Sequence, residues 1–462
     1  MNIKKISKIS LLLFITTITP LFALTHQELA NKVYINNPSL INSKKDVDLA
    51  KLDLKDAKAN YQPTVDFLTT ATYMVNPPLG KIVVNPEDYI TGETGTSGTL
   101  ANLGLDGPIT VYKGMEDTLY NFDIKITQPL YTWNKINTSV SLYDKVVSIK
   151  DIQAKTLFKK LSSELEAREA AVYYLIQMKN NLTEQKEIAE ELISIVNDAY
   201  ENEILVEQDL LEAQIKAKKI DVGLQQIDKE EKTQLSQIIK LTNDRSIGIE
   251  DIEYQFDEKK IDHFLTQDDK VLLDRATSLS NDNIQILSIL DDVKQDELSI
   301  AKNSIYYKPD FALQVEASYS GSRVPLIEKG YYTQDQSGLN FTLAIKTNLW
   351  DGGKKINDIA RKKINEEEAQ YNIDDAKNQI IQTFNENLYT MKLATSNIEY
   401  EELNSKIINS KINNLQQEFE QGYGDKASIL QEQLEKKASE LEILKQKTQR
   451  VQSYFTIMYL LN

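Results

Sequence analysis

Residues 121–131 read NFDIKITQPLY, and the same plan returns at residues 340–350 as NFTLAIKTNLW. In both stretches apolar side chains occupy every second position, which is the pattern of a β-strand with one apolar face. The residue numbers of Phe122 and Phe341 differ by 341 − 122 = 219. The same offset joins Ile124 to Leu343, Ile126 to Ile345, Leu130 to Leu349, Tyr131 to Trp350, Tyr200 to Phe419, Leu211 to Leu430 and Gln214 to Gln433. An offset held without a gap over about 90 residues predicts a duplicated unit built on helices of fixed length.

Each copy contains a second segment of the same alternating kind. We predict strands at 64–75 and 120–131 in the first copy and at 310–320 and 339–350 in the second. Pro63 and Pro309 precede the first strand of each copy and are 246 apart, so the first copy carries 246 − 219 = 27 extra residues. We place these in residues 76–119, which are rich in Gly, Thr, Pro and Asn and predict a long surface loop. Its counterpart, residues 321–338, is shorter.

Helices account for most of the remaining chain. Apolar residues at three- and four-residue spacing, with almost no Gly or Pro, predict helices over 26–61, 135–200, 207–241, 271–306, 354–420 and 426–460. At ~1.5 Å per residue the two longest would each extend over roughly 100 Å. We therefore expect a mainly α fold with a long antiparallel coiled coil. The domains are a first repeat at 24–241, an inter-repeat segment at 242–270 and a second repeat at 271–462.

The first 23 residues predict an export signal. Lys4, Lys5 and Lys8 precede an apolar stretch that closes on Ala23, which is the order of a secretory signal peptide. Without a cysteine at the cleavage site, the mature N-terminus cannot be lipidated on Cys. No later segment has the 18 apolar residues that a membrane-spanning helix needs. The exported protein is therefore expected in the periplasm, outside the cell, or in an outer membrane as β-structure.

Composition excludes several classes of function. The chain has 462 residues, a net charge of −16, no cysteine and two histidines, His26 and His263. An acidic chain without a basic tract is a poor nucleic-acid binder. Neither histidine has metal-ligand neighbours at helical spacing, so we expect both at the surface and predict no metal and no cofactor. No phosphate-binding glycine loop or serine nucleophile motif occurs, which argues against an enzyme.

The predicted strands could form a small soluble sheet or contact lipid on their apolar faces. Aromatic residues at the strand ends favour the membrane, where such residues form an interfacial girdle. The candidates are Tyr61, Tyr131, Trp133, Tyr306, Tyr307 and Trp350. Four strands cannot close a barrel, and open sheet edges are not tolerated in lipid. Several chains would then have to contribute strands to one barrel.

The order of these pieces resembles the TolC-like outer-membrane efflux proteins, across essentially the whole mature chain. The motifs that carry the resemblance are Asn37-Pro38, Ala59-Asn60-Tyr61-Gln62-Pro63, Gln128-Pro129-Leu130-Tyr131, Asn348-Leu349-Trp350-Asp351-Gly352-Gly353, and the turns at 200–211 and 419–430. The resemblance implies a homotrimer in outer-membrane lipid, with a 12-stranded β-barrel continued by a periplasmic helical tunnel. It also implies a periplasmic adaptor and an inner-membrane transporter as partners, in efflux or type I secretion. Residues 242–269 resemble the family's equatorial belt.

The resemblance also indicates a gate at the periplasmic tip, where the family places rings of carboxylates. The matching positions are Asp209 and Glu212 in the first copy and Ser428 and Gln431 in the second, so a full double ring is in doubt. We expect a ring built from Asp209, helped by Asp425, to favour cations. Alternatively, Asp209 is a helix-start acid that stabilises the positive end of its helix.

The two predicted turns form the tip itself. Gly422 and Gly424 permit a tight turn in the second copy, while in the first copy Asn202 is the residue expected in the left-handed conformation. The resemblance assigns adaptor docking to these turns, at Tyr200, Glu203, Phe419, Gly422, Tyr423 and Gly424. The competing function is an exported coiled-coil rod, such as an adhesin stalk, which would need no duplicated strand pairs. The exported substrate is not specified by the sequence.

Overall fold

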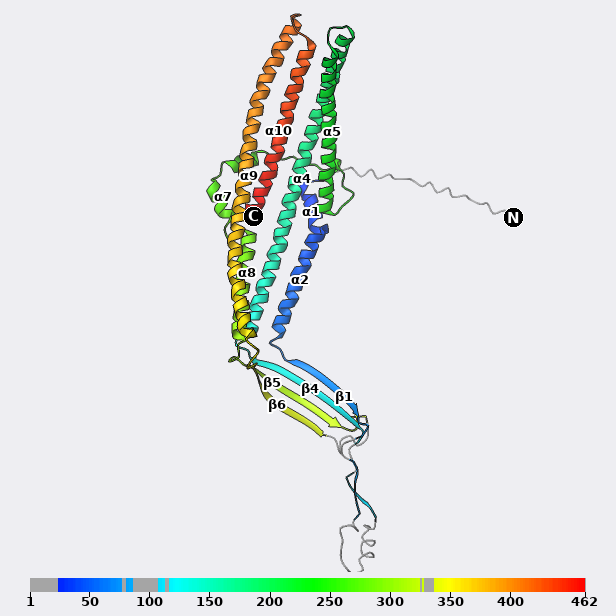
Figure 1. The fold of residues 1–462 in the computed structure, drawn as a ribbon, viewed down its shortest axis with the longest axis vertical. Coiled ribbons are helices and arrows are strands. Elements are labelled where there is room, and N and C mark those ends of the chain that lie inside the picture. Colours follow the sequence, from blue (N-terminus) through cyan, green and yellow to red (C-terminus); the bar gives the residue numbers. More distant parts are fainter. Residues whose placement is uncertain are drawn as a thin grey trace, which may run out of the picture. The chain divides into compact units, whose positions relative to one another are not determined.

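The computed structural model describes residues 24–76, 80–85, 107–112, 116–324, 326–327 and 336–461. The predicted signal peptide, most of the predicted 76–119 loop and half of the predicted 321–338 loop lie outside these ranges. The elements, in chain order, are α1 (His26–Asn36), α2 (Pro38–Ala59), β1 (Thr64–Tyr73), β2 (Ile82–Val84), β3 (Ile109–Tyr112), β4 (Thr118–Tyr131), α4 (Lys135–Glu201), α5 (Glu207–Thr242), the short 3-10 helix Ile249–Asp251, α6 (Lys259–Leu265), α7 (Asp269–Ala276), α8 (Asp282–Asn303), β5 (Asp310–Gly321), β6 (Gln336–Lys346), α9 (Lys354–Glu420) and α10 (Lys426–Leu461). The predicted class, mainly helical with an antiparallel sheet, is confirmed (Figure 1).

The chain divides into two compact units. The helical unit is Met1–Ala50, Val146–Asp291 and Glu368–Asn462, and the sheet unit is Lys51–Lys145 and Asp292–Glu367. Each unit takes segments from both predicted repeats. The repeat boundaries themselves stay a prediction.

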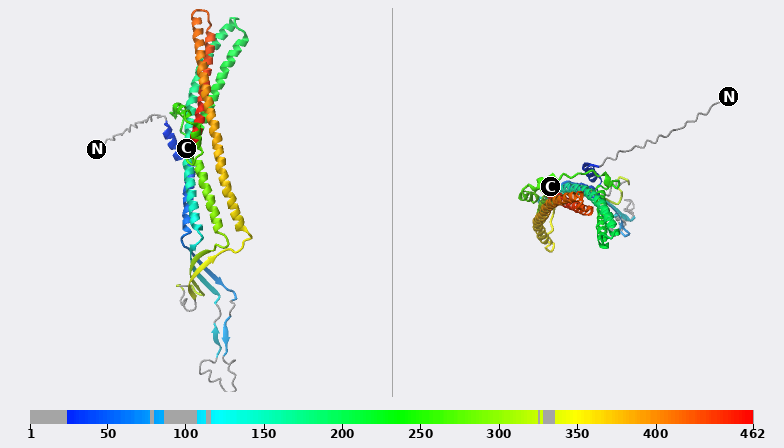
Figure 2. Two further views of the ribbon diagram at one scale, coloured as in Figure 1. Left: turned by 90° about the vertical axis from the view of Figure 1, so that its left-hand side faces the viewer. Right: turned by 90° about the horizontal axis from the view of Figure 1, so that it is seen from above.

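Two helical hairpins of equal dimensions dominate the helical unit. In each, a 67-residue helix, α4 or α9, is followed by a short turn and a 36-residue helix, α5 or α10. Both turns lie at the same end of the unit (Figure 2). Near the turns, buried Leu192 and Val196 of α4 and Ala213 of α5 pack against Leu430 of α10. The first hairpin and the last helix therefore share a core that extends almost to the turns.

The larger core of the helical unit lies around the inter-repeat segment. Phe256 and Phe264 of that segment pack edge to face against Tyr454 of α10, with ring centroids 6.0 and 5.7 Å apart. Tyr174 of α4 and Phe384 of α9 complete this cluster, and both are almost fully buried. Burial of aromatic rings of this size is a large apolar contribution to stability. The segment is thus fixed to both hairpins.

The predicted continuous helix over 26–61 is wrong, because the chain breaks at Asn37. Asn37 is extended, with φ −67° and ψ 119°, as the residue before a proline prefers, and Pro38 begins α2. Its side chain accepts hydrogen bonds from the amides of Ser39 and Leu40, at 3.0 and 3.2 Å, and donates to the Leu241 carbonyl at 2.8 Å.

Asn281 does the same in the second repeat, where the predicted 271–306 helix is divided into α7 and α8. It accepts from the amides of Asn283 and Ile284, at 2.9 and 3.3 Å, and donates to the Leu460 carbonyl at 2.8 Å. Leu241 and Leu460 are again related by the offset of 219. Both asparagines are buried with their amide groups bonded, so each joins the start of one helix to the end of another.

In the sheet unit, four antiparallel strands form one sheet in the order β1-β4-β5-β6 (Figure 1). The register pairs Val65 with Ile126, Ile126 with Val315, and Val315 with Phe341. β2 and β3 form a separate two-stranded sheet. β6 starts before the predicted strand and ends at Lys346 rather than 350, because Asn348 accepts a hydrogen bond from the Trp350 amide at 3.1 Å and turns the chain.

Candidate functional site

The turns of the two hairpins have the same backbone hydrogen bonds. In the first turn the amides of Ile204 and Leu205 both donate to the Ala199 carbonyl, at 2.9 and 3.3 Å. In the second turn the amides of Tyr423 and Gly424 both donate to the Glu418 carbonyl, at 2.9 and 3.2 Å. The two sets are related by the same offset of 219, so the sequence repeat corresponds to one turn geometry used twice.

The left-handed residue of the first turn is Glu203, and the expectation that Asn202 takes this conformation is wrong. Glu203 has φ +60°, and Gly422, its counterpart in the second turn, has φ +81°. Asn202 instead donates its side-chain amide to the Asp198 carbonyl at 2.7 Å, which closes the end of α4. At Gly424 a Cβ would lie 2.8 Å from the Phe419 backbone nitrogen, so a side chain there would require the backbone of this turn to shift.

A carboxylate caps the returning helix in each hairpin, but from a different position. In the first hairpin Asp209, in the first turn of α5, accepts a hydrogen bond from the Val206 amide at 3.2 Å. In the second, Asp425 precedes α10 and accepts from the Ser428 amide at 2.7 Å. Val206 corresponds to Asp425, and Asp209 to Ser428, at the repeat offset. The helix-start interpretation of Asp209 therefore has a contact in the structure.

The other predicted gate residues lie in the first two turns of α5 and α10. Glu212 is exposed and accepts a hydrogen bond from Gln208 at 3.0 Å, and Gln431 is exposed. Asp209 and Ser428 are half-buried. A ring of Asp209 side chains would require further copies of the chain, so the ring stays a prediction.

The tip presents apolar side chains to solvent. Tyr423 is 87% exposed, and Ile204 of the first turn is 75% exposed. Tyr200 and Phe419 at the ends of α4 and α9 are also exposed, together with Glu203. Lys426 of α10 forms an ion pair with Glu191 of α4, so the two hairpins are joined beside these turns.

The sheet has one apolar and one polar face. Because paired residues point to the same side, the register places on one face Val65, Phe67, Ile124, Ile126, Leu313, Val315, Phe341 and Leu343. The opposite face carries the row Asp66, Lys125, Glu316 and Asn340. On that face Asn121 donates to Thr70 at 3.1 Å and accepts from Ser320 at 2.7 Å. Phe67, Phe341 and Leu343 are each more than 60% exposed in the single chain.

The six predicted girdle aromatics lie at the same end of this sheet. β1 and β5 begin there and β4 and β6 end there, as the antiparallel register requires. The Tyr131 ring packs against Trp133 and Phe311, with centroids 5.2 and 6.3 Å apart. Trp133 donates to the Pro309 carbonyl at 2.8 Å. Tyr61 bonds to Asn137, Tyr306 bonds to Asp351, and Tyr307 and Trp350 are exposed.

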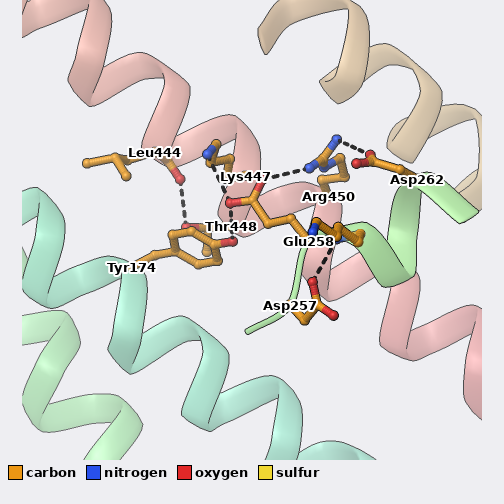
Figure 3. Close-up of polar contacts among 9 residues, drawn as sticks. Tyr174, Asp257, Glu258, Asp262, Leu444, Lys447, Thr448 and Arg450 are labelled. Atoms are coloured by element: carbon orange, nitrogen blue, oxygen red, sulfur yellow. Dashed lines mark hydrogen bonds and ion pairs between the residues drawn. The ribbon is translucent and has the colours of Figure 1, made fainter. Parts of the chain in front are cut away.

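A partly buried ionic network that the sequence does not predict joins the inter-repeat segment to α4 and α10 (Figure 3). Glu258 is at its centre and contacts Arg450 at 2.9 Å and Lys447 at 2.9 Å, while the Tyr174 hydroxyl donates to it at 3.0 Å. Arg450 is almost fully buried and also approaches Asp262 at 3.4 Å. Burial beside the Glu258 charge raises the pKa of Tyr174, so its hydroxyl stays protonated as a donor. The members of the network come from three segments far apart in the chain, which is why no local pattern reveals it.

The sequence predicts both histidines at the surface, and His26 is half-buried, with 33% of its side chain exposed. Its Nδ1 lies 2.6 Å from Oε2 of Glu169, whose side chain is fully buried in α4. His263 is exposed on α6.

In the described part of the chain, no group of three or more His, Cys, Asp and Glu side chains could hold a metal ion. Nor does any described helix have the length and apolar character needed to cross a membrane.

Comparisons with known proteins agree with this architecture. Residues 294–462 match the family model described as outer membrane efflux protein. The fold is similar to VceC from Vibrio cholerae, at 12% identity and TM-score 0.70 over 94% of this chain and 95% of that one. It is similar to the Campylobacter jejuni CmeC outer membrane channel, at 11% identity and TM-score 0.72 over 94% and 85%. The Neisseria gonorrhoeae MtrE outer membrane channel, at 11% identity, gives TM-score 0.66 over 94% and 88%. No curated protein matches the sequence.

The fold is thus that of the outer-membrane channels to which it is similar. The resemblance indicated by the sequence is confirmed, and the match to the efflux family model covers the last strands, α9 and α10.

Proposed function

We propose that this protein is the outer-membrane exit duct of a tripartite efflux or type I secretion system. It would conduct substrates passively, while an inner-membrane transporter supplies the energy and a periplasmic adaptor connects the two. Three copies would each contribute four strands to one 12-stranded barrel. The helical hairpins would form a periplasmic tunnel with its tip at the two turns.

The observation that carries this proposal is the four-stranded sheet with one exposed apolar face. β1 and β6 are its outer strands, and each has one edge with no strand partner among the described residues. Unpaired backbone groups cannot be placed in hydrocarbon, whereas an apolar face of this kind favours it. Pairing β1 of one copy with β6 of the next would satisfy both edges and leave the apolar face toward lipid.

The polar face would then line the interior of the barrel. Asp66 and Glu316 are the cross-strand neighbours of Lys125, so this face alternates in charge within each chain. A water-filled lumen tolerates such charges at low cost because they stay hydrated. Repetition by three copies would give an interior lined with hydrogen-bonding groups, suited to polar and amphipathic cargo.

In the helical unit, the tip would be the gate and the docking surface. The exposed Tyr423 and Ile204 offer apolar anchors to an adaptor, since interfaces are enriched in aromatic anchors. Asp209 would face the axis of the trimer and add a negative potential that favours cations. The cap contact with the Val206 amide uses one oxygen of Asp209, which leaves the other oxygen available at the axis.

The first experiment is the mass of the detergent-extracted protein. The full chain is 52.7 kDa, so three mature copies should give about 150 kDa of protein by light scattering. A trimer recovered only from the outer-membrane fraction, which forms pores in a planar bilayer, is the expected result. A water-soluble monomer or dimer would contradict the shared barrel and favour the coiled-coil rod instead.

A further inference from the structure

The segment Leu24–His26 joins the inter-repeat segment to α4 within the helical unit. The Leu24 backbone nitrogen, which is the α-amino group once the predicted signal peptide is removed, donates to the Asp251 carbonyl at 2.5 Å, and the Glu253 amide donates to the Leu24 carbonyl at 3.3 Å. Thr25 begins α1 with a capping box, in which its own amide donates to Glu28 at 2.8 Å. His26 then reaches α4 through the 2.6 Å contact with Glu169. We call Leu24–His26 the clasp.

Glu169 is an unusual partner, because its side chain is fully buried and only one of its oxygens is bonded. Oε2 contacts His26, while Oε1 has no hydrogen-bond partner among the described residues. A buried carboxylate with an unsatisfied oxygen is costly when ionised. Its charge is compensated only through the proton on His26, so the pair depends on that proton.

The groups that face His26 come from three elements. Glu169 and Glu166 lie on α4, Lys260 lies on α6, and the ring of Tyr254 packs edge to face on His26 with centroids 6.4 Å apart. Tyr254 also donates its hydroxyl to Glu166 at 3.1 Å, which holds that carboxylate near the histidine. Two carboxylates therefore favour the protonated imidazole and one ammonium group opposes it.

These surroundings move both pKa values in the same direction. The hydrogen bond to Glu169 raises the pKa of His26 from its ordinary 6.5, and burial raises the pKa of Glu169 from its ordinary 4.5. A released clasp has the ordinary pKa values, so the docked pair holds one proton more than the released pair between the ordinary His26 pKa and the raised one. Docking is therefore strongest on the acid side and weakens as pH rises through the raised His26 pKa.

We propose that the clasp is a proton-dependent latch, which fastens the inter-repeat segment to α4 while His26 and Glu169 share a proton and releases it in alkaline surroundings. Release would free the Glu253 amide and the chain around Tyr254. The inter-repeat segment also carries Glu258, which binds Arg450 of α10. The clasp would therefore control how firmly this segment is held to both hairpins. This inference concerns the helical unit and does not depend on the proposed duct.

The test is hydrogen exchange of the Glu253 amide in the full detergent-solubilised protein, from about pH 5.5 to 9. The measured rates are first corrected for base-catalysed intrinsic exchange. The protection factor of Glu253 should then fall, across the pH range, by the ratio of the His26 acid dissociation constants in the released and docked forms. Peptides covering residues 426–434 of α10 serve as an internal reference and should show no such trend. A constant Glu253 protection factor in the wild type would overturn the latch, without any variant.

Three variants separate the titration from mere packing. His26→Gln should lower the protection of Glu253 and flatten its dependence on pH, leaving only what the Leu24 α-amino group contributes. Glu169→Gln removes the buried charge and should remove the loss of protection above neutral pH. His263→Gln, the same change at the exposed histidine, should keep the wild-type profile. A wild-type slope in His26→Gln, or a flat profile in His263→Gln, would contradict the assignment to His26.

Discussion

Glu203 and Gly422, which occupy equivalent positions in the two repeats, are the left-handed residues of two turns that share the same backbone hydrogen bonds. A side chain with a Cβ is destabilised in this conformation by roughly 1–2 kcal/mol, whereas glycine adopts it freely. The first turn therefore holds strain that the second avoids. The difference lies beside residues proposed to dock an adaptor, where a less stable turn is easier to reshape on binding.

Glu203→Gly should stabilise the first hairpin, by up to about 1 kcal/mol, because the relief of strain exceeds the added freedom of the unfolded chain. Gly422→Ala should destabilise the second by a similar amount. Asn202→Gly is the matched control, since Asn202 is not left-handed, and it should be destabilising. Hydrogen exchange of the turn amides measures the local stability of each of the three variants. A destabilising Glu203→Gly would show that the Glu203 conformation is not strained.

Asp209→Asn should separate the two roles considered for this carboxylate. The amide oxygen can still accept from the Val206 amide, so the helix cap is largely kept while the charge is lost. Cation preference in bilayer recordings should fall if Asp209 faces the conduction axis. Asp209→Ala should also lower hairpin stability, by about 1 kcal/mol. Glu230→Gln, on the exposed face of the same helix and away from the turn, is the control. Unchanged selectivity in Asp209→Asn would leave Asp209 as a cap alone.

The extent of sequence prediction follows from which contacts are local. The hairpin helices and the four strands can be placed closely because their periodicity and turn residues lie within each segment. Helical periodicity alone does not reveal the helix break at Asn37-Pro38. The sequence does contain a signal for it, because a residue before proline prefers an extended backbone. The Glu258–Arg450 and His26–Glu169 pairs escape prediction because carboxylates and basic groups are common on helix surfaces. Only folding shows which of many carboxylates becomes buried.

Glu258→Gln should loosen the inter-repeat segment more than Arg450→Met does. Removing the Glu258 charge leaves buried Arg450 with only Asp262 at 3.4 Å, and an uncompensated buried charge costs about 3 kcal/mol or more. Arg450→Met removes the buried charge and leaves Glu258 paired with Lys447. Lys447→Met leaves Glu258 paired with Arg450 and should change less than either. Thermal unfolding and the rate of proteolysis at residues 252–258 show which variant loosens the segment most. A reversed order would assign the main role to Arg450 packing.

Leu343→Lys should prevent stable insertion of the sheet into the outer membrane. Leu343 is 62% exposed on the apolar face, and a lysine facing the middle of a bilayer costs about 2–4 kcal/mol. Thr342→Lys, one residue earlier and on the polar face, should be tolerated. Membrane fractionation followed by light scattering compares the two. Equal tolerance of both variants would contradict a lipid-facing role for the apolar side.

The equal dimensions of the two hairpins have a consequence for how this chain can vary. Because successive helical residues are rotated by about 100°, one inserted or deleted residue in α4 would turn every side chain beyond it away from its partners. A substitution disturbs one site, whereas a length change disturbs all later ones. Selection would then preserve residue count while letting residue identity drift. That is consistent with structural neighbours that align over 94% of this chain at 11–12% identity.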